Sequence, residues 1–303
     1  MKDPAAVSWG RILKCGISLG AYSFTVAYEF LIRILGGKPK GSCVILNYHS
    51  IPLEERAKFA RQLDIVVRRA TPIAIDMETM PAPGVRSVGI TFDDGFENFI
   101  SQAFPELERR NIPSTVFVIL DALGNEFGTP DLLERVMSPE QLRAIPENRV
   151  TFGSHTLTHP FLPSLQEQDA FKELLESRVQ LEKMLNRRVV LFSFPFGGFT
   201  EALVRLCHQA GYDRVFTTLP YLAFANAKEF AVGRIRVDTT DWPLEFRLKI
   251  AGAYRWLPWA FAFKKRLLNS RIAASALGSR HKESAGQRVP HSLIRKSASD
   301  LTA

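Results

Sequence analysis

The chain has 303 residues, of which 46% are hydrophobic and 23% are charged, and this composition excludes a polytopic membrane protein. The net charge is +8, but residues 264–303 carry +7 and residues 1–50 carry +4, which leaves −3 for the body of the chain. A nucleic-acid groove needs basic residues on the folded domain itself, so no nucleic-acid partner is expected.

The three cysteines, Cys15, Cys43 and Cys207, are far apart in the sequence. An odd number without a close pair predicts neither a disulfide framework nor a CxxC metal site. We expect them to be small buried apolar residues.

The first expected element is a helix in the apolar segment 12–35. Lys14, Glu29 and Arg33 interrupt this segment, and its longest uncharged run, 15–28, is shorter than the about 20 residues that span a bilayer. No Ala-x-Ala cleavage site follows, which argues against a secretory signal. A helix that lies on a membrane or packs on the domain fits the pattern better.

From residue 42 onward, short apolar runs alternate with helical patterns. The expected strands are 42–48, 72–76, 87–92, 114–119, 149–154, 189–194, 214–217 and 231–237. Runs of this kind are typical of parallel strands that are buried on both faces. About eight of them, alternating with helices, indicate an α/β fold with a TIM-like (β/α) barrel, and an open doubly wound sheet is the competing architecture.

Three helices between these strands have recognisable starts. Ser138 and Gln141 form a predicted capping box, Ser164 and Glu167 form another, and Thr200 is the expected N-cap of a third helix. Each start follows a predicted strand, as the alternating pattern requires.

The segment 251–277 is aromatic and then basic, and we expect it to be helical. It has three interpretations, namely packing on the barrel, an interfacial membrane helix, or saccharide binding through its tryptophans. Together with the apolar N-terminal segment it suits attachment to an anionic membrane surface. The expected division is an N-terminal helix in 1–40, a catalytic barrel in 41–250, this segment, and a disordered basic tail in 278–303.

Polar or backbone-exposing residues follow the ends of four predicted strands. These are His49, then Asp93 and Asp94, then His155 and His159, and finally Pro195-Phe196-Gly197-Gly198. Barrel enzymes assemble their active sites from the carboxyl ends of different strands, so we expect these residues to meet.

His155 and His159 are four residues apart, a separation of about 13 Å in a strand but about 6 Å in a helical turn. Taken alone, they are also compatible with two polar loop histidines, and Asp93-Asp94-Gly95 alone with a turn or a helix cap. Two histidines and one carboxylate are a typical catalytic zinc set with an open position, and a second carboxylate can then accept a proton.

Three motifs in order now point to a family. Thr91-Phe92-Asp93-Asp94-Gly95, His155-Thr-Leu-Thr-His159 and Phe194-Pro-Phe-Gly197 resemble those of the polysaccharide deacetylases (NodB homology domain, carbohydrate esterase family 4). The resemblance covers residues 42 to about 218, including Asn47-Tyr48-His49 at the first strand.

The resemblance implies a distorted (β/α) barrel and a role for each matching residue. Asp94, His155 and His159 would bind a divalent metal ion, with Zn²⁺ expected, and Asp93 would be the catalytic base. The backbone N–H of Phe196 would stabilise the oxyanion, while Pro195, Gly197 and Gly198 would contact the substrate.

The sequence departs from the family pattern at two places. No arginine precedes Pro195 within 191–194, so nothing in the sequence shows what orients Asp93. The late general-acid histidine also has no counterpart, and His49 is the candidate substitute. Asp238 to Trp242 superficially matches another family motif and equally resembles a surface turn, so Trp242 is a candidate groove residue.

The prediction is therefore metal-dependent hydrolysis of the N-acetyl group of an amino sugar in a polysaccharide or glycan precursor, with release of acetate. The alternatives are another C–N hydrolase that acts on a small amide, formamide or cyclic imide, and a non-catalytic saccharide-binding protein at a membrane surface. We expect a peripheral protein of a bacterial-type cell envelope, on the cytoplasmic face. The sequence makes no prediction of oligomeric state.

Overall fold

The computed structural model describes residues 9–76, 80–130, 132–226, 229–261 and 263. The chain divides into two units, Met1–Pro258 and Trp259–Ala303. The expected tail and most of the aromatic-basic segment lie outside the described residues, and the domain boundaries expected from the sequence stay predictions. The fold described below is that of the first unit.

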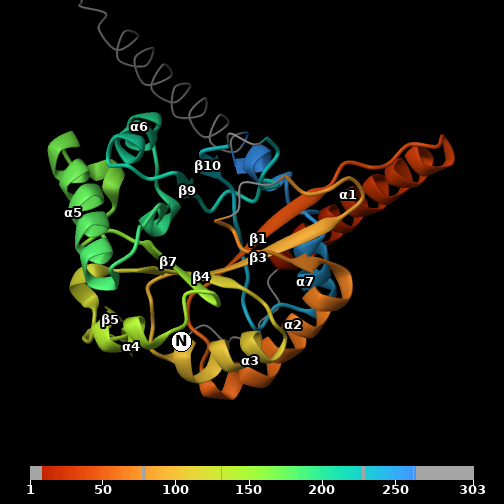
Figure 1. Cartoon of the computed structure of the whole chain (residues 1–303). Coiled ribbons are helices and arrows are strands. Elements are labelled where there is room, and N and C mark those ends of the chain that lie inside the picture. Colours follow the sequence, from red (N-terminus) through yellow and green to blue (C-terminus); the bar gives the residue numbers. More distant parts are fainter. Residues whose placement is uncertain (1–8, 77–79, 131, 227–228, 262, 264–303) are drawn as a thin grey trace, which may run out of the picture. The chain divides into compact units, whose positions relative to one another are not determined.

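A parallel sheet forms the centre of this unit (Figure 1). Its strands are β1 Ser42–Tyr48, β2 Thr71–Pro72, β3 Arg86–Phe92, β4 Ser114–Val118, β7 Val150–Ser154, β8 Leu191–Ser193, β9 Arg214–Phe216, β10 Ala231–Val232 and β11 Ile235–Arg236. Within the described residues their order is β10-β9-β8-β7-β4-β3-β1-β11, and β2 is added to β3. All of these pairings are parallel.

Helices connect the strands and cover the sheet, because successive parallel strands need a crossover. The helices are α1 Trp9–Ile34, α2 Arg56–Arg69, α3 Phe104–Arg109, α4 Pro139–Ala144, α5 Glu167–Leu185, α6 Glu201–Gln209 and α7 Pro243–Ile250. Figure 1 shows α2 to α7 arranged around the sheet. The main core lies between them and is rich in aromatic residues such as Tyr48, Phe59 and Phe92.

The two ends of the sheet are joined by a very short piece of chain. β10 and β11 stand at opposite ends of the strand order, yet only Gly233 and Arg234 lie between them. In a flat sheet, the outermost of eight strands would be roughly 34 Å apart. Three peptide units reach roughly 10 Å, so the sheet has to curl. The expected distorted (β/α) barrel is thereby confirmed, and the open doubly wound sheet is excluded.

The same closure corrects one expected strand. Residues 231–237 were expected to form a single strand, whereas Gly233 and Arg234 divide it into β10 and β11. A side chain at Gly233 would overlap with the carbonyl group of Leu219, so glycine lets the chain cross closely from one edge of the sheet to the other.

The structure differs from the expected strands at two further places. The expected strand 72–76 pairs only through Thr71–Pro72. An antiparallel hairpin of β5 Glu126–Thr129 and β6 Leu132–Arg135 was not expected at all. β5 is mostly exposed, so it has no buried face to produce the alternating pattern that reveals a strand.

The helix starts were mostly as predicted. Ser138 and Gln141 form the expected capping box of α4, and the Thr200 side chain caps α6. Ser164 does not cap α5, because its hydroxyl donates to the carbonyl of Phe161 in a short 3₁₀ turn. Cys15, Cys43 and Cys207 are buried free thiols, as expected.

The N-terminal helix is longer than the uncharged run suggested. α1 has 26 residues, which corresponds to roughly 39 Å. By length and composition alone it is able to cross a membrane, although its longest uncharged run, 15–28, is shorter than a span. Lys14, Glu29 and Arg33 lie within this helix.

Candidate metal centre and active site

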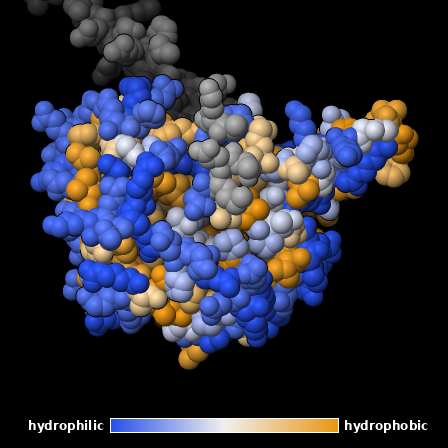
Figure 2. Space-filling model, viewed as in Figure 1, coloured by the Kyte–Doolittle hydropathy of each residue, from blue (hydrophilic) through white to orange (hydrophobic). Residues whose placement is uncertain are grey.

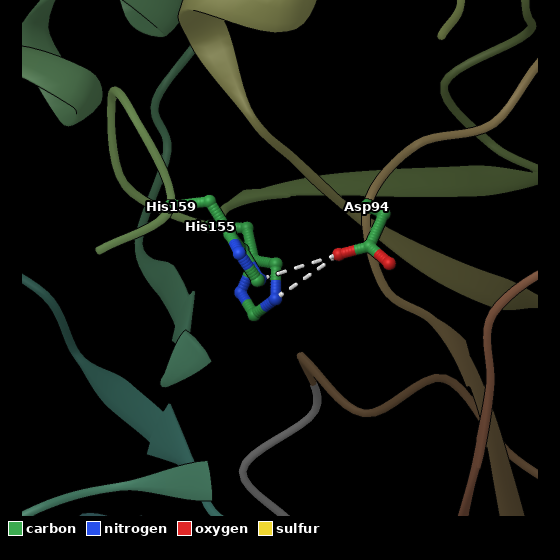
Figure 3. Close-up of side chains that lie close together, drawn as sticks. All are labelled: Asp94, His155 and His159. Atoms are coloured by element: carbon green, nitrogen blue, oxygen red, sulfur yellow. Dashed lines mark ion pairs between the residues drawn. The ribbon is translucent and has the colours of Figure 1, made fainter. Parts of the chain in front are cut away.

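Asp94, His155 and His159 come together at the carboxyl ends of two strands. Asp94 follows β3, whereas His155 and His159 follow β7. One ligand atom from each residue lies within 4.8 Å of the others. The Nε2 atoms of both histidines are 3.5 Å from Asp94 Oδ1, and Figure 3 shows the two imidazoles facing this carboxylate.

The loop that presents the histidines is not the helical turn that their spacing suggested. Thr156 and His159 have positive φ angles of 72° and 61°, and so does Asp94 at 70°. This left-handed conformation is uncommon for non-glycine residues and is found preferentially at functional sites. The pairing of the histidines is therefore produced by a strained loop.

A carboxylate on α5 holds this loop in place. Glu173 accepts hydrogen bonds from the N–H groups of Leu157 and Thr158, at 2.9 and 3.1 Å, and from the Thr158 hydroxyl at 2.8 Å. The Thr156 hydroxyl oxygen also accepts the N–H of His159 at 2.9 Å. These contacts fix the loop between the two candidate ligands.

Both histidines are in the form that binds a cation. Burial lowers the pKa of His155 to about 3 and that of His159 to about 4, so both rings are neutral at pH 7. The Nδ1 atom of His155 lies 2.7 Å from the carbonyl oxygen of Ser193, which can only accept a hydrogen bond. Nδ1 therefore carries the proton, and the lone pair of Nε2 faces Asp94.

The carboxylate of Asp94 needs a positive partner. Burial and then repulsion by Asp93 raise its pKa to about 7. Its Oδ1 atom is buried and has no hydrogen-bond partner among the described residues, which is a costly arrangement. A divalent cation would satisfy this oxygen and both imidazoles at once, so the residues fit a metal site of the catalytic zinc type.

Asp93 is held by an arginine that the sequence analysis missed. Arg234 is fully buried, and its two terminal nitrogens contact Asp93 Oδ1 at 2.7 Å and Oδ2 at 2.8 Å. This bidentate pair holds the pKa of Asp93 well below its ordinary value, although burial alone would raise it. Asn47 adds a third donor, 3.1 Å from Oδ2.

Arg234 was expected within a single strand 231–237, with no role in the site. Its guanidinium lies over the rings of Phe117 and Phe216 and also donates to Ser193 Oγ at 2.7 Å. The apolar run 231–237 contains two arginines, Arg234 and Arg236, and nothing in the sequence showed which of them is buried. The partner of Arg234 lies 141 residues earlier, so the pair could not be recognised locally.

His49 lies at the end of β1 and is mostly buried, which lowers its pKa. The charge of Asp93 acts on it, and His49 in turn acts on His159. The structure therefore places this candidate catalytic histidine within electrostatic reach of the cluster.

The segment Pro195–Gly197 forms a 3₁₀ turn directly after β8. Phe196 has a positive φ of 57°, and its ring packs edge-on against His159 with the centroids 4.6 Å apart. The start of such a turn leaves N–H groups without intrahelical acceptors, which suits the expected oxyanion role of Phe196. Added side chains at Gly197 and Gly198 would overlap with Thr218 and Phe161, so packing also favours glycine at both positions.

Trp242 has surroundings other than those expected of a groove residue. It is the N-cap residue of α7, and the Arg11 guanidinium of α1 lies 4.5 Å from its ring centroid. The neighbouring Asp241 pairs with Lys249 at 2.6 Å. These contacts give the Asp238–Trp242 segment a structural role at the junction of α1 and α7.

Comparisons with known proteins point to polysaccharide deacetylases. The family model described as polysaccharide deacetylase matches residues 81–215. YxkH of Bacillus subtilis is 26% identical over 156 residues, which are 52% of this chain and 53% of that protein. The poly-β-1,6-N-acetyl-D-glucosamine N-deacetylase of Staphylococcus epidermidis is 28% identical over 164 residues, 50% of this chain and 55% of its own length.

A solved structure extends the likeness to the fold. IcaB from Ammonifex degensii has a TM-score of 0.61 and 24% identity, and the match covers 71% of this chain and 98% of that one. The chain spans about half the length of the curated relatives that it matches. The similarity therefore concerns the barrel and the strand ends that carry the cluster.

Proposed function

We propose that the protein hydrolyses the N-acetyl group of an amino sugar in a polysaccharide or glycan precursor, as expected of the polysaccharide deacetylase family, whose model matches residues 81–215. The observation that carries the proposal is the cluster of Asp94, His155 and His159 beside a second, separately held aspartate. We infer that Asp94 binds a cation and that Asp93 moves a proton.

Asp94, His155 and His159 would hold a divalent ion, and we propose Zn²⁺ because two neutral imidazoles and a carboxylate suit it. When bound, the ion would polarise the amide carbonyl and acidify a nearby water molecule.

Asp93 is proposed as the base that removes a proton from the attacking water. Arg234 keeps it ionised and fixes both of its oxygens, so its orientation does not depend on the substrate. Among the described residues, Arg234 is the donor to Oδ1, which leaves that oxygen a second lone pair for the proton. A low pKa makes Asp93 a weak base, but it also makes the captured proton easy to pass on.

Two further residues complete the proposed reaction. The N–H of Phe196 would donate to the oxyanion that forms on the acetyl group. The departing amine needs a proton, which is the one captured by Asp93, and His49, whose pKa is lowered by burial, is the proposed relay between them. Acetate and the free amino sugar are the products.

The substrate class follows from the names of the relatives. They include N-deacetylases of poly-β-1,6-N-acetyl-D-glucosamine and of peptidoglycan N-acetylglucosamine. We therefore propose an N-acetylglucosamine polymer and a location at the cell envelope. The cytoplasmic face expected from the sequence is not part of the proposal, because mature envelope glycans lie outside the cytoplasmic membrane.

The test is acetate release from N-acetylglucosamine oligomers of increasing length by the zinc-loaded protein. We expect Asp93→Asn to abolish release while zinc binding persists, and His155→Ala to lose both. Circular dichroism should show the same fold for both variants. Full activity in either variant would end the proposal.

A second candidate rests on the missing late histidine, which weakens the match to the glycan-specific pattern. A related C–N hydrolase acting on a small amide, formamide or cyclic imide would use the same cluster. A substrate panel that measures acetate and formate separates the two functions. A non-catalytic saccharide-binding role would require zinc stoichiometry near zero.

A further inference from the structure

α1 contacts the rest of the first unit along one stripe of residues. Its positions that are not exposed, apart from Ala21, are Arg11, Cys15, Ser18, Tyr22, Thr25, Glu29 and Ile32. Their spacing alternates between four and three residues, which is the repeat of a helix that packs along its whole length. α1 is therefore attached to the domain from its first turn to its last.

The attachment is largely polar. Arg11 Nε pairs with Glu245 at 2.7 Å, and the indole N–H of Trp256 donates to Ser18 Oγ at 2.9 Å. Near the other end of α1, Glu29 pairs with Arg86 at 2.9 Å. The helix thus directs its polar residues to the protein, which is the reverse of an ordinary surface helix.

The outward face of α1 is mostly apolar, and the charged side chains on it are all positive. Eleven of its large hydrophobic side chains are at least 41% exposed: Trp9, Ile12, Leu13, Ile17, Leu19, Phe24, Val26, Tyr28, Phe30, Leu31 and Ile34. The charged residues on this face are Lys14 and Arg33. Figure 2 shows the apolar residues gathered at the outer end of α1. Faces of this kind mark contact with a membrane or a partner.

A cavity of about 200 Å³ lies beside this face, between α1, α2 and α7. Three arginines line it, Arg69 from α2, Arg86 from β3 and Arg247 from α7. Arg86 is paired with Glu29, whereas Arg69 and Arg247 are exposed and have no acidic partner among the described residues. The arginines of this cavity therefore favour the binding of an anion.

The cavity is small and has an apolar rim. It is below the roughly 300–1,000 Å³ of ordinary small-molecule pockets, so it suits a headgroup better than a whole lipid. Leu19 and Leu244, which also line it, are 43% and 46% exposed. The rim thus continues the outward face of α1, and acyl chains would leave the cavity along it.

We propose that the outward face of α1 lies in the plane of a bilayer surface and that this cavity binds the phosphate headgroup of an anionic membrane lipid. A transmembrane position of α1 would move Arg11 and Glu29 away from their partners and into hydrocarbon, at high cost. A second copy of the chain would bring two positive faces together. Anionic lipid complements both the face and the cavity.

The test is co-sedimentation of the full chain with vesicles of phosphatidylcholine alone, and with vesicles in which about a third of the lipid is phosphatidylglycerol. We expect much stronger partitioning to the anionic vesicles. The variant Arg69→Gln/Arg247→Gln should lose roughly thirtyfold in that partitioning, at the usual contribution of an interfacial arginine. Leu13→Glu/Phe24→Glu should lose binding to both kinds of vesicle.

The matched control is Arg61→Gln/Arg205→Gln, which removes two exposed arginines that do not line the cavity. All variants retain the basic C-terminal segment, so its contribution cancels. Equal partitioning of the cavity variant and the unchanged chain would overturn the proposal. So would a phosphate-induced rise in melting temperature without vesicle binding, or a dimer that Leu13→Glu/Phe24→Glu separates.

Discussion

At the residue scale, Asp93 and Arg234 illustrate how a buried ion pair serves a site. Both side chains are removed from water, so neither is tolerable without the other. The pair also gives the two adjacent aspartates opposite pKa shifts. Arg234 lowers the pKa of Asp93 and keeps this side chain ionised, whereas the pKa of Asp94 is raised. Neighbouring carboxylates with opposite shifts are typical of sites that divide two roles between them.

Arg234→Met should therefore damage both stability and catalysis. Removing one partner of a buried pair leaves an uncompensated charge, and the expected loss in unfolding free energy is about 3–5 kcal/mol. The pKa of Asp93 should rise, so the acid limb of the pH–rate profile for acetate release should move to higher pH. Urea unfolding and the profile measure the two effects.

Arg236→Met is the control for this variant, because Arg236 is two residues away and exposed. We expect it to change unfolding by less than about 0.5 kcal/mol. Adding Asp93→Asn to Arg234→Met should restore part of the lost stability, since no buried charge remains. Independent, additive losses would contradict the pairing.

Asp94 gives the metal site a distinctive pH dependence. Its pKa is raised to about 7, whereas those of His155 and His159 are lowered to about 3 and about 4. Between about pH 5 and pH 7 the histidines are already neutral, and Asp94 is the ligand that must lose a proton before a cation binds. Zinc affinity should therefore rise about tenfold per pH unit up to about pH 7 and then level off.

Isothermal titration calorimetry with zinc across this pH range would measure how the zinc affinity changes with pH and how many protons are released. One proton per ion is expected. The Asp94→Asn variant should bind zinc weakly, and its zinc affinity should not rise with pH in this range, because the amide side chain does not titrate. Release of two protons, centred on the ordinary histidine pKa of 6.5, would show that the histidines control binding instead.

At the scale of elements, the loop after β7 and helix α5 act as one unit. Glu173 on α5 accepts three hydrogen bonds from Leu157 and Thr158, so it determines the position of both histidines without being a ligand itself. Partners of this kind commonly contribute as much to metal affinity as the geometry of the ligands.

Glu173→Ala should weaken zinc binding about 10- to 100-fold, with the fold retained. Competition with a chelator measures the affinity, and circular dichroism measures the fold. Glu176→Ala, one turn further along α5, removes the same charge without those three bonds and should bind zinc almost normally. Equal losses in both variants would indicate an effect of charge and not of loop position.

At the scale of the whole first unit, closure of the sheet connects the fold to the site. Because β10 and β11 are on opposite ends of the strand order, Gly233 and Arg234 cross between them, and Arg234 then reaches Asp93 in the interior. The late part of the chain thus completes a site whose other members lie between residues 47 and 198. The N-terminal helix α1 is attached to the same unit through α7.

The sequence by itself determined the features that are encoded locally. The short apolar runs predicted the alternating strands and the barrel, since burial on both faces leaves a continuous apolar pattern. The position of Asp94, His155 and His159 just after strands predicted their meeting, because parallel strands direct their carboxyl ends to one edge.

Only the tertiary structure decided what depends on distant parts of the chain. The partner of Asp93 is 141 residues away and follows from closure of the sheet, which no local pattern records. The left-handed loop around Thr156 is held by Glu173 of another element, and the helical spacing of the histidines therefore gave the wrong local conformation. The polar stripe of α1 likewise became visible only with its partners in place, because its polar side chains face the domain and its apolar ones face outward, the reverse of the usual amphipathic pattern.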